Sequence, residues 1–380
     1  MVTEDFIRRH LDADVCALAL QRNRYPDVDI DFALRQIEGY QRAKDKLPTL
    51  SQLEGWWFPP RLNIEQCSSE ATARYKASLV NGSTLADLTG GYGIDSFFLS
   101  ENFCHTDYVE QQKELCRIAE HNFQLEHRPI VVHEQNCLDY IRTMSPVDCI
   151  YMDPARRGES GAKVVRLEDC LPNVSDIYSL LKTRCKVLLL KLSPMLDVSI
   201  ALSTLSEAAE VHIVEVEGEV KELLVLCRFG TSASLSVNAV QLTKTTSRCF
   251  SFTPDEEQNA ESLMAVQLEQ YLYEPSPSIL KAGAFRTISE RYHIAKLASN
   301  THLYTSSSLV SDFPGRIFEV TALPQKKDVR KQQYNLITRN YPQDTATLRH
   351  SLQLRDGGDQ YLIGTRLGTR PVLILANRLQ

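Results

Sequence analysis

Short apolar runs alternate with longer amphipathic stretches between residues 84 and 228. The runs have the length of strands, and the stretches between the first six runs are long enough for crossover helices. Such alternation predicts an α/β fold built on a parallel, doubly wound sheet. The seven predicted strands are Leu85–Asp87, Asp107–Glu110, Ile130–His133, Val147–Met152, Val187–Leu192, Val211–Val216 and Leu223–Cys227.

The last two predicted strands are linked by only a few residues around Gly218. So short a link forces the two strands into an antiparallel hairpin, because parallel strands need a long crossover connection. We therefore expect a seven-stranded sheet in which six parallel strands are followed by one antiparallel strand.

The region before the sheet has helical spacing of its apolar positions, so residues 1–78 are predicted to be helical. Both tryptophans of the chain lie in the loop Trp56–Pro60, which is either a lid or a packing element. Ser69 is a candidate N-cap for a helix that begins at Glu70. The polar segment Glu65–Lys76 either folds over a cofactor or is a simple capped helix.

After residue 230 the composition turns to Ser and Thr. Residues 231–250 resemble strands and a loop, and helices are predicted over Asp255–Leu272 and Ile279–Leu297. The tail from Phe313 mixes strands and turns. The predicted organisation is a helical region at 1–78, a sheet domain at 79–230, and small α+β domains at 231–312 and 313–380.

Charge is distributed unevenly along the chain. The net charge of −6 gives no overall nucleic-acid signature, but residues 316–380 hold eleven Lys/Arg against five Asp/Glu. The preceding 315 residues hold 31 Lys/Arg against 43 Asp/Glu. The basic tail is either a polyanion-binding end or a chance cluster on a solvated face.

The ten cysteines form no Cys-x-x-Cys pair and no pattern with His at metal spacing, so no metal site is expected. They lie mostly in apolar runs, which is typical of buried reduced thiols and of a cytoplasmic protein. No apolar run approaches 18 residues, and the acidic N-terminus has no apolar core. We therefore expect neither a membrane span nor a signal peptide.

Residues 84–95 read as a short strand, a glycine turn and the start of a helix. Asp87 lies four residues before Gly91 and six before Gly93, unlike the Gly-x-Gly-x-x-Gly of dinucleotide sites. An acid beside the turn would repel a pyrophosphate, but it suits the cationic amino group and sulfonium of S-adenosyl-L-methionine. We therefore expect this cofactor, bound here by Asp87, Thr89, Gly90, Gly91 and Gly93.

The next two strand ends supply further candidate cofactor contacts. Glu110 lies about 20 residues past the glycine turn and can accept both ribose hydroxyls; the alternative is an exposed acid at a helix start. Asn136 is predicted to meet the adenine amino group, with Cys137 or Leu138 against the ring. The alternative for Asn136 is a helix cap.

The fourth strand ends in Asp153-Pro154, which places a carboxylate and a rigid carbonyl beside the methyl donor. These acceptors can hold the N–H of a base, orient its lone pair and take up its proton. Arg156 and Arg157 are candidates to grip a phosphate. The alternative is a plain strand-end turn with solvated arginines.

The fifth strand ends with two candidate substrate contacts. Lys191 lies within an apolar run, which is unusual for an interior strand, and it either snorkels to the surface or binds the substrate phosphate. Ser193, followed by Pro194, lies at the mouth of the same strand.

The stretches Asp87–Asp95 and Tyr151–Arg156 resemble those of class I adenosylmethionine-dependent methyltransferases, which have a Rossmann-like sheet. The whole chain resembles bacterial members with a helical N-terminus, a ferredoxin-like module and a THUMP-like C-terminal domain. THUMP domains of better-known enzymes bind tRNA, so the resemblance implies an RNA substrate by analogy. The other matching stretches are Glu65–Glu70, Glu274–Gly283, Thr301–Tyr304, Phe313–Arg316 and Arg355–Gly358.

The stretch Asp153–Gly158 also resembles the Asp-Pro-Pro-Arg motif of RNA 5-methyluridine methyltransferases. Those enzymes attack carbon 6 of the pyrimidine with a cysteine at the mouth of the fifth strand, where this chain has Ser193. A serine hydroxyl is far less ionised than a thiol, and no base is evident beside it. Methylation of a nitrogen, or of a ribose oxygen, is therefore expected rather than methylation of carbon 5.

The sequence thus predicts an adenosylmethionine-dependent methyltransferase acting on a base nitrogen in structured RNA, either tRNA or rRNA. One alternative is a catalytically inactive RNA-binding protein of this fold, because Ala155 stands where an aromatic residue or proline is commoner. Another is a methyltransferase for proteins or small molecules, which suits the acidic body. The sequence leaves the oligomeric state open.

Overall fold

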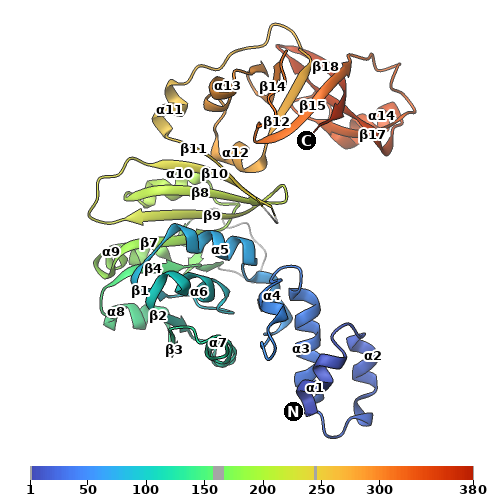
Figure 1. Cartoon of the computed structure of the whole chain (residues 1–380). Coiled ribbons are helices and arrows are strands. Elements are labelled where there is room, and N and C mark those ends of the chain that lie inside the picture. Colours follow the sequence, from blue (N-terminus) through green and yellow to red (C-terminus); the bar gives the residue numbers. More distant parts are fainter. Residues whose placement is uncertain (1, 157–166, 244–245, 380) are drawn as a thin grey trace. The chain divides into compact units, whose positions relative to one another are not determined.

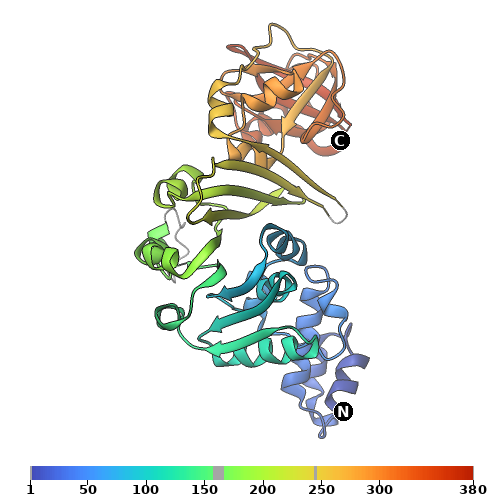
Figure 2. The same cartoon turned by 60° about the vertical axis from the view of Figure 1, so that its left-hand side comes forward.

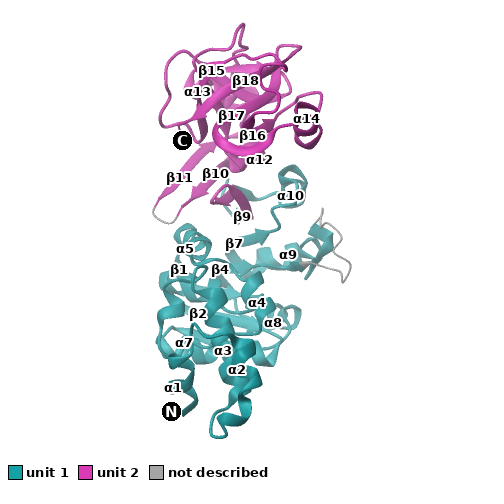
Figure 3. Ribbon diagram, turned by 90° about the vertical axis from the view of Figure 1, so that its right-hand side faces the viewer, with its two compact units in different colours: residues 1–209, 223–233 teal, residues 210–222, 234–380 magenta. Residues whose placement is uncertain are grey.

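The computed structural model describes residues 2–156, 167–243 and 246–379 (Figure 1). The chain divides into two compact units, residues 1–209 with 223–233 and residues 210–222 with 234–380 (Figure 3). The first unit holds the N-terminal helices and most strands of the larger sheet. The second holds the strands of that sheet within residues 210–222 and 234–252, together with a separate C-terminal sheet.

The N-terminal region is helical, as its apolar spacing predicts. Phe6 and Leu18 pack with residues of the third helix into a small core of their own. Ser69 caps α5 by accepting the N–H of Thr72 at 3.3 Å, which confirms the predicted cap. The elements are α1 (Val2–Arg9), α2 (Val15–Leu20), α3 (Ile30–Ala43), α4 (Arg61–Gln66) and α5 (Glu70–Leu79), with 3₁₀ turns η1 (Arg22–Arg24) and η2 (Leu50–Gln52).

The larger sheet has the strand order β11-β10-β8-β9-β7-β4-β1-β2-β3. The pairs from β3 to β7 are parallel, and β9 is antiparallel to β7. The predicted α/β fold with its antiparallel hairpin strand is therefore confirmed. The strands are β1 (Gly82–Asp87), β2 (Phe103–Glu110), β3 (Ile130–Glu134), β4 (Val147–Met152), β7 (Cys185–Leu192), β8 (Ala208–Val216), β9 (Glu219–Arg228), β10 (Ser236–Leu242) and β11 (Ser247–Phe252).

The β8–β9 hairpin turns at Glu217 and Gly218, both of which have positive φ, as a tight hairpin with the right-handed strand twist requires. The sheet has nine strands rather than the predicted seven. β10 pairs in parallel with β8, and β11 pairs antiparallel with β10 (Figure 2). These two strands cover an edge of β8 that would otherwise offer unpaired backbone groups.

Helices flank the parallel strands. α7 packs against β2 and β3, and α9 packs against β4 and β7 (Figures 1 and 2). The connecting elements are α6 (Ile94–Leu99), α7 (Lys113–Leu125), α8 (Cys137–Thr143), α9 (Val174–Arg184) and α10 (Val198–Thr204), with 3₁₀ turns η3 (Ser100–Asn102) and η4 (Leu167–Asp169) and a short strand pair, β5 (Ala155–Arg156) with β6 (Cys170–Leu171).

The C-terminal sheet of the second unit has the order β13-β14-β12-β15-β18-β17-β16. Leu272, Leu297 and Leu303 share one core with Phe318 and Ile374, so the strands before and after residue 314 form a single hydrophobic layer. The elements are β12 (Tyr271–Pro275), β13 (Ala295–Ala298), β14 (Thr301–Ser306), β15 (Gly315–Ala322), β16 (Gln333–Thr338), β17 (Arg355–Leu367), β18 (Arg370–Arg378), α11 (Pro254–Asn259), α12 (Pro277–Ala282), α13 (Thr287–Tyr292) and α14 (Thr345–Leu352).

Two helices predicted in this region are wrong in extent. The helix predicted to run to Leu272 ends at Asn259, and the following segment bridges to β13 through Met264. The helix predicted over 279–297 is broken in two, because Gly283 and His293 take left-handed conformations at the ends of α12 and α13. A residue in this conformation ends a helix by directing the chain away from the helix axis.

Candidate functional site

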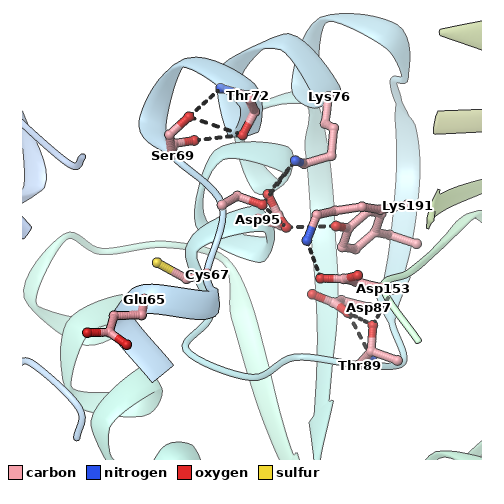
Figure 4. Close-up of polar contacts among 12 residues, drawn as sticks. Glu65, Cys67, Ser69, Thr72, Lys76, Asp87, Thr89, Asp95, Asp153 and Lys191 are labelled. Atoms are coloured by element: carbon pink, nitrogen blue, oxygen red, sulfur yellow. Dashed lines mark hydrogen bonds and ion pairs between the residues drawn. The ribbon is translucent and has the colours of Figure 1, made fainter. Parts of the chain in front are cut away.

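Three neighbouring parallel strands bring together three predicted site residues, one for each of the cofactor, the catalytic step and the substrate. β4 pairs with β1 on one side and with β7 on the other. Because parallel strands end at the same edge of a sheet, Asp87 of β1, Asp153 after β4 and Lys191 of β7 lie close together. Figure 4 shows these three side chains pointing toward one another.

The glycine turn between β1 and α6 requires glycine at three positions. Gly91 and Gly93 have φ of 56° and 83°, in the left-handed region that other residues rarely adopt. A Cβ on Gly90 would lie 2.2 Å from Cε2 of Tyr108, and one on Gly93 would lie 2.8 Å from Cζ of Phe123. The turn is thus closely packed on its protein side. A Cβ on Gly91 would meet only the carbonyl of Thr89, at 3.8 Å.

Glu110, at the end of β2, holds this turn through its carboxylate. Oε2 accepts the N–H of Gly91 at 2.9 Å, and Oε1 accepts the N–H of Gln112 at 2.8 Å. On the same strand, the Tyr108 hydroxyl donates to the carbonyl of Gly91 at 2.6 Å. A carboxylate has about four lone-pair positions, so Glu110 keeps acceptor capacity for a ligand.

Asp87 is 1 % exposed and holds the turn from the other side. Its Oδ1 accepts the N–H of Thr89 at 2.9 Å, and its Oδ2 accepts the hydroxyl of Ser96 at 2.5 Å. Burial raises the pKa of Asp87 to about 7, although both of these hydrogen bonds favour the charged form. Its direct contact with a cofactor stays a prediction, whereas its bond to the turn is observed.

Asp153 is tied to both neighbouring strands. Its backbone N–H donates to Oγ1 of Thr89 at 2.6 Å, and its carboxylate forms an ion pair with Lys191. Burial raises the pKa of Asp153 above its ordinary value, and the positive charge of Lys191 opposes the rise. Pro154 is buried directly after it. The ion pair accounts for the charge of Lys191 within an apolar strand.

A second charged pair, which the sequence analysis missed, lies beside these residues (Figure 4). Lys76 of α5 is fully buried, and its Nζ lies 3.2 Å from Oδ1 of Asp95 on α6. Oδ2 of Asp95 accepts the hydroxyls of Ser68 at 2.8 Å and Tyr151 at 2.7 Å. Burial alone would raise the pKa of Asp95, but Lys76, Lys191 and these hydroxyls outweigh it, so the pKa is lowered.

One signal in the sequence could have found Lys76. It follows Ala73 by three residues and precedes Ala77, both of which are buried, so it lies on the buried stripe of its helix. A lysine on such a stripe needs an anionic partner. The segment Glu65–Lys76 thus contains a capped helix, as one of its two interpretations held, and its last residue pairs with Asp95; that it folds over a cofactor stays a prediction.

The predicted adenine contacts lie at the start of α8. Asn136 is its N-cap, and Oδ1 accepts the N–H of Leu138 at 2.8 Å. The helix-cap alternative is therefore observed, and contact with adenine stays a prediction. Cys137 follows at the first position of the helix and is half-buried.

The predicted substrate contacts are described in part. Ser193 accepts the N–H of Met195 at 3.2 Å. The backbone of Arg156 pairs with Cys170 in the β5–β6 strand pair, and Arg157 lies outside the described residues. Cys67 is drawn beside the charged network in Figure 4, and burial raises its pKa to about 11, so it remains a neutral thiol.

The tryptophan loop packs against the glycine turn and α7. Nε1 of Trp56, a residue 5 % exposed, donates to the hydroxyl of Tyr92 at 2.7 Å. Trp57 stacks on His121 with ring centroids 3.8 Å apart. Of the two readings of this loop, the structure therefore supports packing.

Part of the basic tail has a structural role. Arg316 and Arg339 both form ion pairs with Glu274, which is 3 % exposed in β12.

Within residues 2–156, 167–243 and 246–379, no group of three His, Cys, Asp or Glu side chains is arranged to hold a metal ion. Over the same residues, no helix has the length and apolar character needed to cross a bilayer.

Comparison with known proteins identifies relatives over the whole chain. Residues 271–314 match the family described as a ferredoxin-like domain, and residues 315–378 match one described as THUMP domain-like. The crystal structure of a "putative methyltransferase" from Porphyromonas gingivalis W83 is 31 % identical and has a TM-score of 0.88, covering 100 % of this chain and 98 % of that one. No curated protein matches the chain.

Other solved structures resemble a part of the chain. SMU.1697c from Streptococcus mutans, in complex with SAH, is 13 % identical over 41 % of this chain and 95 % of that one, with a TM-score of 0.31. M. capricolum TrmK, also with SAH, is 12 % identical over 43 % of this chain and 70 % of that one, with a TM-score of 0.33. With TM-scores this low, neither structure supports a conclusion about this chain.

Proposed function

Since this chain belongs to the bacterial class I methyltransferase family with C-terminal ferredoxin-like and THUMP-like domains, we propose that it is an S-adenosyl-L-methionine-dependent methyltransferase acting on structured RNA. The target we assign is a nitrogen of a base in tRNA or rRNA. This target rests on the chemistry of the strand ends and on the analogy of the THUMP-like domain.

The observation that carries the proposal is the position of Thr89. Its N–H donates to Asp87, and its hydroxyl accepts the N–H of Asp153 at 2.6 Å. One residue therefore connects the glycine turn, where the cofactor would bind, to the Asp-Pro segment, where the methyl acceptor would bind. Such a connection fixes the position of the methyl donor relative to the methyl acceptor. This positioning is the main contribution an enzyme makes to a direct transfer.

The residues present fit this cofactor. Open space beside Gly91 lets a ligand approach the backbone, and Glu110 keeps acceptor capacity for two ribose hydroxyls. The charges of Asp87, Asp95 and Asp153 exceed those of Lys76 and Lys191 by one when all are ionised, which suits a ligand with net positive charge. When bound, the cofactor supplies an electrophilic methyl group on a sulfonium.

The chain's own groups would prepare the acceptor nitrogen. The Asp153 carboxylate and the carbonyl of Pro154 would accept its N–H bonds and orient its lone pair, and the Asp153 carboxylate would take up the proton that leaves the nitrogen as the methyl group moves from sulfur to nitrogen. Neither Ser193 nor the neutral thiol of Cys67 is an activated nucleophile, so attack on pyrimidine carbon 6 is not supported. A base within a stem would have to leave its stack to reach Asp153.

The experiment is methyl transfer from labelled adenosylmethionine to total RNA of a strain that lacks the gene. We expect label in one modified nucleoside, to be named by mass spectrometry. Asp153→Asn should lose at least about 100-fold in transfer rate at saturating adenosylmethionine. Transfer at the wild-type rate by this variant would contradict the assigned role of Asp153.

A second candidate, an RNA-binding protein without turnover, is favoured by one observation. The Lys191 ammonium already pairs with the Asp153 carboxylate. This observation adds to the presence of Ala155 where an aromatic residue or proline is commoner. For that candidate, RNA binding would persist while no labelled methyl group was transferred. A methyltransferase for proteins or small molecules would show transfer without RNA affinity.

A further inference from the structure

Three side chains in the second unit form a cluster that the proposed function does not use. The rings of Phe285 and His302 stack with centroids 3.8 Å apart, and Nζ of Lys296 lies over the Phe285 ring at 5.6 Å. Phe285 and His302 are half-buried, whereas Lys296 is 9 % exposed. His302 belongs to the stretch Thr301–Tyr304, which carries the family resemblance and has no assigned role.

The alternation of strand side chains explains why these groups meet. Leu297 of β13 and Leu303 of β14 face the core of the C-terminal sheet. His302, the neighbour of Leu303, therefore faces the other side, because successive residues of a strand point to opposite faces. Lys296 lies at a bulge of β13, and its Nζ is placed on the same side by its position over the Phe285 ring. The loop between α12 and α13 passes over that side and brings Phe285 onto them.

Lys296 is a buried cation without an anionic partner. Within the described part of the chain its Nζ has no hydrogen bond or ion pair, and its contact is the ring of Phe285. Glu257 acts on it at longer range, but that carboxylate accepts the N–H groups of Phe285, Arg286 and Thr287 and the Thr287 hydroxyl. The Lys296 side chain is mostly buried although its Nζ is not among the fully enclosed atoms, and burial lowers its pKa, so holding the ammonium here without a paired anion has a free-energy cost.

His302 adds a second unused polar group. Its Nδ1 is buried and has no hydrogen-bond partner among the described residues. Burial, and then the charge of Lys296, lower the pKa of His302, so the imidazole is neutral and can both donate and accept. Residues 277–304 hold four Lys/Arg and one Glu, while Glu256 of α11 pairs with Arg291 and Glu257 binds the backbone of the same segment.

We propose that Phe285, Lys296 and His302 form a binding site for one unpaired nucleotide of the RNA, with its phosphate on Lys296 and its base against the Phe285–His302 ring pair. Aromatic side chains beside a cation are the usual means of holding single-stranded nucleic acid, because every base has a face that can stack. The site deepens the proposed function and rests on its RNA partner.

Binding of bulk bacterial tRNA by the full-length protein, measured across a salt series, tests the site. Lys296→Met should weaken binding about tenfold and reduce the log–log salt slope by about 0.7–0.9, the contribution of one phosphate contact. Phe285→Leu should weaken binding about tenfold with the slope unchanged, because stacking is not a charge contact. Lys296→Arg should keep most of the affinity, and Lys186→Met, a charge-matched surface control, should keep all of it.

Thermal unfolding of the same variants separates this role from a structural one. If Lys296 serves to bind a ligand, its ammonium destabilises the protein in the absence of that ligand. Lys296→Met should therefore leave the melting temperature unchanged or raise it. A lowered melting temperature, or failure to fold, would make Lys296 a structural residue and overturn the site. Unchanged tRNA affinity in Lys296→Met would overturn this nucleotide site but not the RNA partner. A wild-type protein that binds no RNA would overturn both the site and the RNA assignment.

Discussion

The backbone N–H of Gly91 donates a 2.9 Å hydrogen bond to Oε2 of Glu110. This bond joins the glycine turn after β1 to the end of β2. The same carboxylate accepts the N–H of Gln112 through its other oxygen. Glu110 therefore has an observed structural role as well as the proposed one toward ribose. Removing it should affect both the shape of the turn and the affinity for the cofactor.

Glu110→Ala should weaken adenosylmethionine binding by at least about 30-fold, because it removes charge-assisted hydrogen bonds worth about 1.5–3 kcal/mol each. Glu110→Gln, which keeps one acceptor oxygen, should lose less. Isothermal titration calorimetry measures both affinities. Glu114→Ala is the matched control, since Glu114 lies on α7 and pairs with Arg35 at the surface. Equal affinities for all three variants would remove Glu110 from the site.

Gly90→Ala should destabilise the protein by about 1–3 kcal/mol, because the new Cβ would lie 2.2 Å from a ring carbon of Tyr108, which is fully buried. Displacing that ring also breaks its hydrogen bond to Gly91. Urea unfolding measures the change. Gly218→Ala is the comparison for backbone strain without a clash, because Gly218, unlike Gly90, has positive φ and nothing lies within 4 Å of the added carbon. A larger effect at Gly218 than at Gly90 would contradict the packing argument.

Asp87 should make stability fall as the pH rises from about 4 to 7. Its pKa is raised from 3.8 to about 7 by burial, so over that range the folded state keeps a proton that the unfolded state releases. Asp87→Asn removes this effect, and its stability relative to wild type should increase between pH 5 and 8 by on the order of 3 kcal/mol. Urea unfolding at pH 5, 6.5 and 8 measures the difference.

The control for Asp87 has a pKa shift of the opposite sign. The Lys186 ammonium, together with the N–H groups of Ser83 and Thr84, lowers the pKa of Asp148 to about 2. Asp148→Asn should therefore destabilise the protein by a constant amount between pH 5 and 8, where Asp148 is already ionised in both states. A pH-independent effect of Asp87→Asn would mean that Asp87 is charged in the folded protein throughout this range.

Lys76→Met should destabilise the protein by about 3–5 kcal/mol, because it leaves the Asp95 carboxylate buried without its cation. Adding Asp95→Asn should recover most of that loss, since the second change removes the unpaired charge. A double-mutant cycle by urea unfolding measures the coupling. The surface pair of Lys186 and Asp148 gives the comparison, with a coupling below about 1 kcal/mol. Additive effects of Lys76→Met and Asp95→Asn would argue against the pair.

The candidate site residues that could be predicted from the sequence are those at the ends of the parallel strands. The ends of β1, β2, β4 and β7 could be located because each apolar run stops at a polar residue, and parallel strands end at one edge. Thr89 is an example of what could not be predicted. Its place in the motif was recognised, but its hydrogen bond to the N–H of Asp153 depends on the pairing of β1 with β4.

Contacts between distant segments account for the remaining differences. Lys76 pairs with Asp95 because α5 and α6 pack together, and the local sequence of either helix does not predict this packing. The helix predicted over residues 279–297 was misjudged because Gly283 and His293 stop α12 and α13 through backbone conformation while the apolar spacing continues. The helix predicted from Asp255 ends at Asn259, where Ala260 is extended. β10 and β11 were recognised as strands, but their sheet could be known only from their pairing with β8.

Calorimetry of the purified protein with adenosylmethionine and, separately, with NAD tests the central claim most directly. The claim is that acids on two neighbouring strands and the glycine turn between them bind a sulfonium nucleoside rather than a dinucleotide. We predict saturable binding of adenosylmethionine at one site per chain and no heat of binding with NAD. Binding of NAD, or no binding of adenosylmethionine, would contradict the account.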